Sequence, residues 1–317
     1  MSSPTLVCIV PNPSIDKTAE VDRLETGSIH RPPAVVAVPG GKGLNVARSA
    51  QSLGLAVEAV VLLAGHAGRW IDDELRRLSL DHVVAWADGE TRSCLSVLDR
   101  ATGRLTEFYE AGDGVSAAAW GDYVDRIRAA VEAKPQGTLV ALSGSLPAGA
   151  PADAAPTIVG IARAAGSVVL VDTSGPQLAG ALAAEPDVVK VNTDEASGLL
   201  GMAIGTEGDA ATAARALGER GAARAIVTRG RDGAVGWDGR TAWAVEAAES
   251  GGPYSVGSGD AFLAGFAAGL AEDQSFDACL RRAAAAGTAS TLVAGQGRLD
   301  RSAADRLLAS TTVHRLD

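Results

Sequence analysis

The feature that most constrains the fold is a regular alternation of helical and extended segments from residue 120 onward. Helices are expected at 120–133, 153–165, 177–183 and 209–219, and the short apolar strands that follow them at 138–142, 167–171, 187–191 and 224–228. Strands connected by helices of this length run parallel in a sheet that is covered on both faces. Polar or glycine-rich turns follow the strands, so they are expected at the carboxyl edge of the sheet, where such folds bind ligands.

The N-terminal third adds three buried strands and a pair of alternating segments. Strands are expected at 6–10, 57–63 and 82–87, with an antiparallel hairpin over 92–110 that turns at 100–103. A hairpin placed between βα units indicates a small sheet that stands away from the main one. The sequence therefore predicts one α/β domain over residues 1–317, with a small β lid formed by segments near 16–38 and 90–112.

The composition excludes several classes of partner. The chain has 317 residues, a net charge of −10 and a pI near 5.0, which argues against nucleic acid or an anionic membrane as the main partner. Its three cysteines are far apart and have no metal-ligand spacing, as in proteins of a reducing compartment. No signal peptide or bilayer-spanning apolar run is apparent. We therefore expect a cytoplasmic protein.

A glycine-rich turn, Gly257-Ser258-Gly259-Asp260, directly precedes an apolar segment with the periodicity of a buried helix. Amides at a helix start are unpaired and carry a partial positive charge, so Gly257, Ser258 and Gly259 are candidate anion ligands. Asp260 would repel an anion there unless its carboxylate acts on a nearby group. Phosphoryl transfer needs both functions, amides for the transferred group and a base for the attacking hydroxyl. A simple helix cap with turn glycines is the alternative interpretation.

The N-terminal third also carries candidate substrate ligands. Asp16 follows the first strand, where a ligand or a simple turn would place a carboxylate. Gly40 and Gly41 would let the backbone approach a ligand closely, and Lys42 and Asn45 would share one face of the next helix. The spacing matches neither a Walker A loop nor the dinucleotide fingerprint. A glycine turn with a solvated lysine is the alternative.

Taken in order, these motifs resemble those of the ribokinase-like (PfkB) carbohydrate kinases. Gly40-Gly41-Lys42-Gly43 with Asn45 resembles the N-terminal sugar motif, and 256–262 resembles the C-terminal signature with its anion hole and catalytic Asp260. Asn192 and Glu195 match the Asn-x-x-Glu motif linked to magnesium and phosphate, and Thr228, Gly230 and Gly233 match the nucleotide turn. The resemblance covers about residues 6–297, and the motifs occur in the family's order and spacing.

Within this family the chain looks most similar to kinases of phosphorylated hexoses, such as 1-phosphofructokinase and tagatose-6-phosphate kinase. The resemblance implies that Asp16 binds sugar hydroxyls, that Arg92, Arg104 and Ser143 lie at the sugar-phosphate side, and that Lys190 and Ser290 lie at the nucleotide side. Two departures stand out. The hairpin ends in 106–112 without the family's Asn-Glu-Pro-Gly, and Ser290 stands where relatives often have asparagine.

The resemblance implies ATP-dependent phosphorylation of a sugar phosphate with Mg²⁺, by a homodimer that pairs through the lid. Three cations, Lys42, Arg92 and Arg104, favour a phosphorylated over a neutral substrate. A kinase of ribose, a nucleoside or a keto-deoxy sugar acid is the first alternative. A non-catalytic sugar sensor on the same fold is the second, although it would have no use for Asp260. A dehydrogenase is excluded because the first turn lacks the glycine fingerprint.

Overall fold

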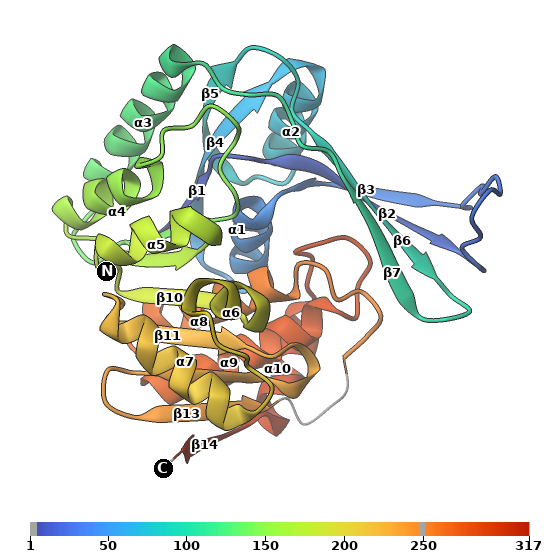
Figure 1. Ribbon diagram of the computed structural model, residues 1–317. Coiled ribbons are helices and arrows are strands. Elements are labelled where there is room, and N and C mark those ends of the chain that lie inside the picture. The colour runs from blue at the N-terminus through green and yellow to red at the C-terminus, as the bar shows by residue number, and fades with distance from the viewer. Residues whose placement is uncertain (1–4, 247–250, 317) are drawn as a thin grey trace.

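The structure, a computed structural model, describes residues 5–246 and 251–316, and its largest sheet has ten strands (Figure 1). Their order is β14-β13-β12-β11-β10-β9-β8-β1-β4-β5. These strands are β1 Thr5–Val10, β4 Ala56–Ala64, β5 Asp81–Ala87, β8 Leu139–Ser143, β9 Val168–Asp172, β10 Val188–Asn192, β11 Arg224–Thr228, β12 Ala234–Trp237, β13 Ala242–Glu246 and β14 Thr312–Leu316.

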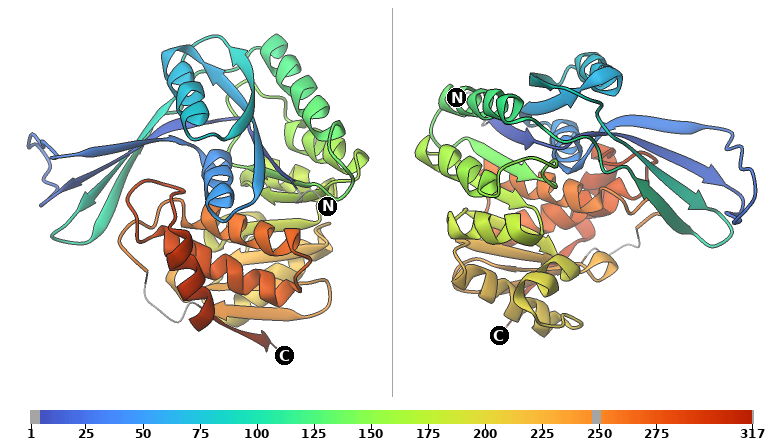
Figure 2. Two further views of the ribbon diagram at one scale, coloured as in Figure 1. Left: turned by 180° about the vertical axis from the view of Figure 1, so that it is seen from behind. Right: turned by 45° about the horizontal axis from the view of Figure 1, so that its top comes forward.

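Helices cover both faces of this sheet, as Figures 1 and 2 show from opposite sides. They are α1 Lys42–Ser52, α2 Gly65–Arg77, α3 Ala117–Glu132, α4 Ala154–Ala164, α5 Gly175–Ala183, α6 Thr193–Leu200, α7 Glu207–Glu219, α8 Ser258–Ala271, α9 Phe276–Ser290 and α10 Arg301–Ser310, with a short 3₁₀ turn at Gly230–Asp232. The seven neighbouring strands β11-β10-β9-β8-β1-β4-β5 of this sheet run parallel, which confirms the predicted α/β class with a mostly parallel sheet.

The sequence interpretation missed two parts of this architecture. Strands β12, β13 and β14 extend the sheet beyond β11, each antiparallel to the strand before it, and they are short, with Gly236 inside β12. Helix α6 begins where only a polar turn was expected. Its first turn is rich in polar groups because Asn192 and Glu195 form a reciprocal capping box, so polarity there marks a helix start rather than a loop.

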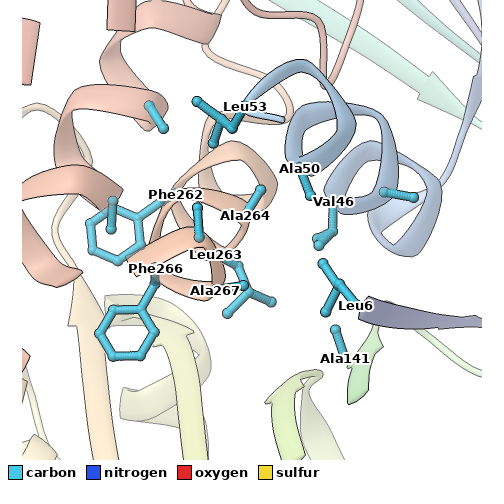
Figure 3. Close-up of a cluster of buried hydrophobic side chains, with 14 of the residues drawn as sticks. Leu6, Val46, Ala50, Leu53, Ala141, Phe262, Leu263, Ala264, Phe266 and Ala267 are labelled. Carbon is cyan, nitrogen blue, oxygen red and sulfur yellow. The ribbon is translucent and has the colours of Figure 1, made fainter. Parts of the chain in front are cut away.

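The core lies on both sides of the sheet because successive residues of β1 point in opposite directions. Leu6 and Cys8 belong to the part of the core that includes residues of α1, α8 and α9, whereas Val7 and Ile9 belong to the part on the opposite face, which includes residues of α3, α4 and α7. Figure 3 shows Leu6 beneath the facing surfaces of α1 and α8. Small residues allow close helix packing, since a Cβ at Gly265 would lie 2.7 Å from a carbonyl oxygen of α9. A densely packed core therefore holds in place the helices that begin at the carboxyl edge of the sheet.

The second sheet has four strands in the order β3-β2-β6-β7 and projects from the main sheet (Figures 1 and 2). They are β2 Ser14–Val21, β3 Val35–Gly40, β6 Ser93–Asp99 and β7 Arg104–Tyr109. Strands β6 and β7 form the predicted antiparallel hairpin, and β6 pairs in parallel with β2. Asp16 lies within β2 rather than in a turn after β1. Within the described residues, no helix is both long and apolar enough for a bilayer crossing.

Candidate active site

The site is built where the parallel strands end. Strand β1 pairs with β4 on one side and with β8 on the other, so the sheet is extended from β1 first in one direction and later in the other. Such a switch point opens a crevice at the carboxyl edge of a parallel sheet. The ends of β8, β9 and β10 meet the starts of α1 and α8 here, which brings together residues from five separate segments.

Asp260 lies in the first turn of α8 and is 5% exposed. Its Oδ2 accepts a hydrogen bond of 2.9 Å from Nδ2 of Asn45 in α1, 215 residues earlier in the sequence. The helix is preceded by Gly257, whose φ of 84° lies in the left-handed region that favours glycine. The two glycine motifs of the sequence therefore meet at one carboxylate.

Neighbouring groups approach the glycines of this helix start closely, and the contact of Gly257 with backbone requires glycine there. A Cβ at Gly257 would lie 2.7 Å from the amide nitrogen of Gly297, and one at Gly259 would lie 2.8 Å from Nζ of Lys190. The Ser258 amide donates to the Ser255 carbonyl at 3.2 Å. Of the three expected anion ligands, Ser258 therefore already has an acceptor, and Gly257 and Gly259 are the better candidates.

Beside Asp260 lies a cluster of alternating charges. Asp172, at the end of β9 and fully buried, accepts from Nζ of Lys42 at 2.9 Å and from Nζ of Lys190 at 2.6 Å. Lys42 also donates to Oε1 of Glu195 at 2.9 Å. The sequence interpretation did not assign Asp172 a role, although its place at the end of a buried strand was the available signal. It also assigned Lys42 to the substrate, whereas its ammonium is held between two carboxylates.

Burial first, and then the charge of Asp172, raise the pKa of Asp260 from 3.8 to about 7. Lys42 and Lys190 and the bond from Asn45 act in the opposite direction. Burial alone would also raise the pKa of Asp172, but the two lysines hold it below its ordinary value. Burial disfavours the charge of Lys42, yet the surrounding carboxylates raise its pKa. The cluster therefore concentrates its ionised charge on Asp172 and the lysines, and leaves Asp260 poised near neutrality.

A second buried carboxylate lies at the base of the small sheet. Asp16 accepts from the Gly41 amide at 3.2 Å and from Oγ of Ser14 at 2.6 Å, and burial raises its pKa. Gly40 must be glycine, because a Cβ there would lie 2.0 Å from Cγ of Asp16. Asp16, Gly40 and Gly41 are thus in contact with one another.

Arg92 and Ser143 each present a buried polar atom that has no hydrogen-bond partner in the described structure, Nε and Oγ respectively. The guanidinium of Arg92 donates to the Asn12 carbonyl at 3.3 Å, and the Asn12 side chain donates to Oγ of Ser145 at 3.0 Å. These contacts connect the base of the hairpin to the turn after β8.

The three expected cations do not converge within one chain. Arg104 is exposed and pairs in register with Asp99 at the tip of the hairpin, whereas Arg92 precedes β6 at its base. Lys42 is engaged by Asp172 and Glu195. Arg104 therefore lies apart from the other two, whereas Arg92 and Lys42 both lie near the turn after β8, since a Cβ at Gly144 would be 3.4 Å from Cβ of Lys42.

The residues expected to bind nucleotide lie further along the same edge. Asn192 and Glu195 cap α6, and Oγ1 of Thr228 donates to the Val191 carbonyl at 3.3 Å. Gly230 and Gly233 have positive φ, and a Cβ at Gly233 would lie 2.0 Å from a carbonyl oxygen. Ser290 is buried in α9, where its hydroxyl donates to the Gly287 carbonyl at 2.8 Å.

Comparison with known proteins decides the family. The model of the pfkB family carbohydrate kinases matches residues 5–301. The chain belongs to this family. It is 35% identical over 285 residues to a 1-phosphofructokinase of Xanthomonas campestris pv. campestris, covering 88% of each chain. Family membership makes the chain an ATP-dependent sugar kinase and confirms the motif resemblance.

Solved structures support the same assignment. Escherichia coli phosphofructokinase-2 in complex with fructose-6-phosphate has a TM-score of 0.86 at 26% identity, covering 98% of this chain and 99% of that one. The tetrameric inhibited form of the same enzyme gives 0.87 at 26% identity, with coverage of 96% and 98%. Arabidopsis thaliana ribokinase, complexed with ribose and ATP, gives 0.72 at 23% identity over 96% of this chain and 99% of that one, and shows a shared ribokinase-like fold.

The electrostatics of the cluster predict an anomalous titration. In ligand-free protein the Asp260 carboxyl should titrate near pH 7, and Lys42→Met should move this titration to higher pH because a neighbouring cation is lost. Carbon-detected NMR of side-chain carboxyls, with Asp260→Asn to assign the signal, measures both values. Lys134→Met is the matched control, since the Lys134 ammonium pairs instead with Glu58 at 2.6 Å. An Asp260 titration below pH 5 would contradict this picture of the cluster.

Proposed function

We propose that the protein transfers the γ-phosphoryl group of ATP to a hydroxyl of a phosphorylated hexose, as a kinase of the 1-phosphofructokinase or tagatose-6-phosphate kinase type. The observation that carries this proposal is the buried Asp260 carboxylate in the first turn of α8, with an anomalously high pKa and a bond from Asn45. A base of this kind beside helix-start amides suits phosphoryl transfer. The matching 1-phosphofructokinase supports the acceptor class.

In this proposal Asp260 accepts the proton of the attacking hydroxyl as its oxygen forms a bond to the γ-phosphorus. The bond from that phosphorus to the bridging oxygen breaks, and ADP leaves with the electron pair. The amides of Gly257 and Gly259 bind the transferring group, with Ser258 joining if its bond to Ser255 opens. Lys190, whose ammonium lies beside Gly259, adds positive charge to the same place.

Magnesium fits the oxygen donors at the start of α6 when it is bound through water. Oδ1 of Asn192 and Oε2 of Glu195 accept the capping bonds of 2.8 and 2.9 Å, and each oxygen keeps a lone pair for a metal-bound water. This arrangement suits an ion that retains most of its waters. When bound with ATP, magnesium would neutralise charge that develops on the phosphates.

The sugar and its existing phosphate would lie between the two sheets. Asp16 is held where it can bind hydroxyls, and the guanidinium of Arg92 at the base of the hairpin can receive a phosphate. The Escherichia coli relative in complex with fructose-6-phosphate supports a ligand of this class. Thr228, Gly230, Gly233 and Ser290 would contact the nucleotide.

Two alternatives remain distinguishable by assay. A kinase of ribose, a nucleoside or a keto-deoxy sugar acid would be favoured by the finding that Arg104 lies apart from Arg92 and that Lys42 is paired with carboxylates. A sensor without activity would release no ADP. A coupled ADP-release screen over fructose 1-phosphate, fructose 6-phosphate, tagatose 6-phosphate, ribose and nucleosides separates these functions, and the proposal expects a hexose phosphate to give the highest kcat/KM.

Replacing the proposed base tests the chemistry. Asp260→Asn should lower kcat by about 10²–10⁴-fold, the usual contribution of a general base, with both substrates still bound. In the wild type, kcat/KM should fall as the pH drops below about 7, because protonated Asp260 cannot accept the hydroxyl proton. Steady-state kinetics across pH measures both effects. The assignment fails if the variant keeps more than half of the wild-type kcat.

Arg92→Ala tests the phosphate contact. A hydrogen bond to a charged group contributes roughly 1.5–3 kcal/mol, so KM for the hexose phosphate should rise about ten- to a hundred-fold while KM for ATP changes little. Arg126→Ala is the control, because this helical arginine pairs with Asp122 on the surface. If Arg92→Ala leaves the sugar-phosphate KM unaltered, or a neutral sugar is the better substrate, the phosphate site is misassigned.

We further propose that the small sheet is a lid that pairs with its copy in a homodimer. Its edges expose Val35, Phe108 and Tyr109, which are 50%, 58% and 56% exposed, and an uncovered apolar sheet edge is a liability. Sedimentation velocity at micromolar concentration should show self-association that Phe108→Glu weakens. Leu292→Glu, an exposed site outside the lid, is the control. A wild-type monomer would refute the pairing.

A further inference from the structure

One buried guanidinium lies behind the proposed base. Arg48 is in α1, one turn after Asn45, and is 6% exposed. Its Nη2 donates to Oδ1 of Asn45 at 2.7 Å and to the backbone carbonyl of Gln296. Asn45 in turn donates from Nδ2 to Asp260. The three side chains thus form a directed series of hydrogen bonds that ends at the carboxylate.

The direction of this series follows from what each group can donate. A guanidinium only donates, and a carboxylate that is ionised only accepts. The Asn45 amide has an oxygen at one side and an NH₂ at the other, and the two orientations have nearly the same shape. With Arg48 present, the flipped orientation would set two donors against each other and two acceptors against each other. Arg48 therefore selects the orientation in which the NH₂ group faces Asp260.

We propose that Arg48 is a positioning residue for the phosphoryl-transfer step, which orients the Asn45 amide so that it holds and stabilises the carboxylate of Asp260. This inference rests on the proposed role of Asp260 as the base. Arg48 itself is one side chain removed from the reacting atoms. Its effect on turnover passes through Asn45.

The same guanidinium connects the base to the small sheet. Gln296 accepts from Arg48 through its backbone carbonyl, while its side chain donates to Oγ of Ser96 in β6 at 3.1 Å. The turn is pressed against α1, since a Cβ at Gly297 would lie 2.6 Å from Cα of Asn45. A continuous hydrogen-bond path therefore runs from the small sheet to Asp260, and Arg48 is its central member.

The charge of Arg48 is consistent with this function. Burial lowers its pKa to about 10, while the nearby carboxylates of Asp16 and Asp260 act against that effect. The side chain is therefore cationic near neutral pH and keeps its donor-only character. Besides Asp172, Lys42 and Lys190, it is one of the charged groups that surround the base.

The test is a double-mutant cycle between Arg48→Met and Asn45→Ala. Arg48→Met should lower kcat about ten- to a hundred-fold, the value of one hydrogen bond to a charged group, with little change in KM for either substrate. The acid limb of kcat/KM should move to higher pH, because the bond that lowers the pKa of Asp260 is weakened. In the Asn45→Ala background, Arg48→Met should lower kcat by less than about twofold, because the side chain through which Arg48 acts is already absent.

Ser49→Ala is the matched control. Ser49 is the next residue in α1 and donates to the Gly297 carbonyl at 3.0 Å, so its loss removes one bond to the same turn and leaves the hydrogen bonds of the Asn45 side chain in place. It should leave kcat and the acid limb unchanged. If Arg48→Met does not fold, Arg48→Lys carries the same cycle, because lysine keeps the charge but not the fork of donors.

Two results would overturn the inference. One is that the effects of Arg48→Met and Asn45→Ala multiply fully, and the other is that Arg48→Met leaves the acid limb in place. Failure of the proposed function looks different, because Asp260→Asn would then remain active. If Asp260→Asn is inactive and the effects of Arg48→Met and Asn45→Ala multiply fully, the role of Asp260 as the base stands and only the role of Arg48 is refuted.

Discussion

The site depends on the balance of charge buried between Asp172 and Asp260. An unpaired carboxylate in a protein interior costs several kcal/mol, and two side by side cost more. Lys42 and Lys190 offset the charge of Asp172 directly, each through a short bond. Asp260 is stabilised less, by the more distant charges of the same two lysines and by a hydrogen bond from the neutral amide of Asn45. This uneven division keeps one carboxylate ionised and raises the pKa of the other to about 7, a value that suits a general base near neutral pH.

Such a division requires segments from distant parts of the chain to approach closely. Gly257 and Gly297 make the approach possible, since a side chain at either would overlap backbone of the neighbouring segment. Gly40 likewise leaves room for Asp16. The alanine-rich helices α8 and α9 serve the same end on a larger scale, because small residues bring their axes together beneath the site. Glycine and alanine residues therefore determine where the charged groups lie as much as the ion pairs between those groups do.

The sequence predicted the fold class well because strand and helix alternate with clear periodicity, but it did not show that the two glycine motifs meet at Asp260, since one follows a strand of the small sheet and the other follows a loop. It could not show contacts that depend on how distant segments pair in three dimensions. Lys42 was assigned to the substrate because nothing in the sequence shows that Asp172, 130 residues later, takes its ammonium. Arg104 and Arg92 lie on one hairpin, yet register separates them to its two ends. Arg48 resembled an ordinary helix residue, and only its buried contacts with Asn45 and Gln296 distinguish it.

The central claim is that Asp260 takes the proton from a hydroxyl of a phosphorylated hexose. A crystal structure with fructose 1-phosphate or fructose 6-phosphate and a non-hydrolysable ATP analogue tests it most directly. The account predicts one sugar hydroxyl within about 2.6–3.2 Å of an Asp260 carboxylate oxygen. It also predicts the γ-phosphate before the start of α8 and the sugar phosphate against Arg92. A sugar bound with its hydroxyls away from Asp260, or with its phosphate in place of the γ-phosphate, would contradict the account.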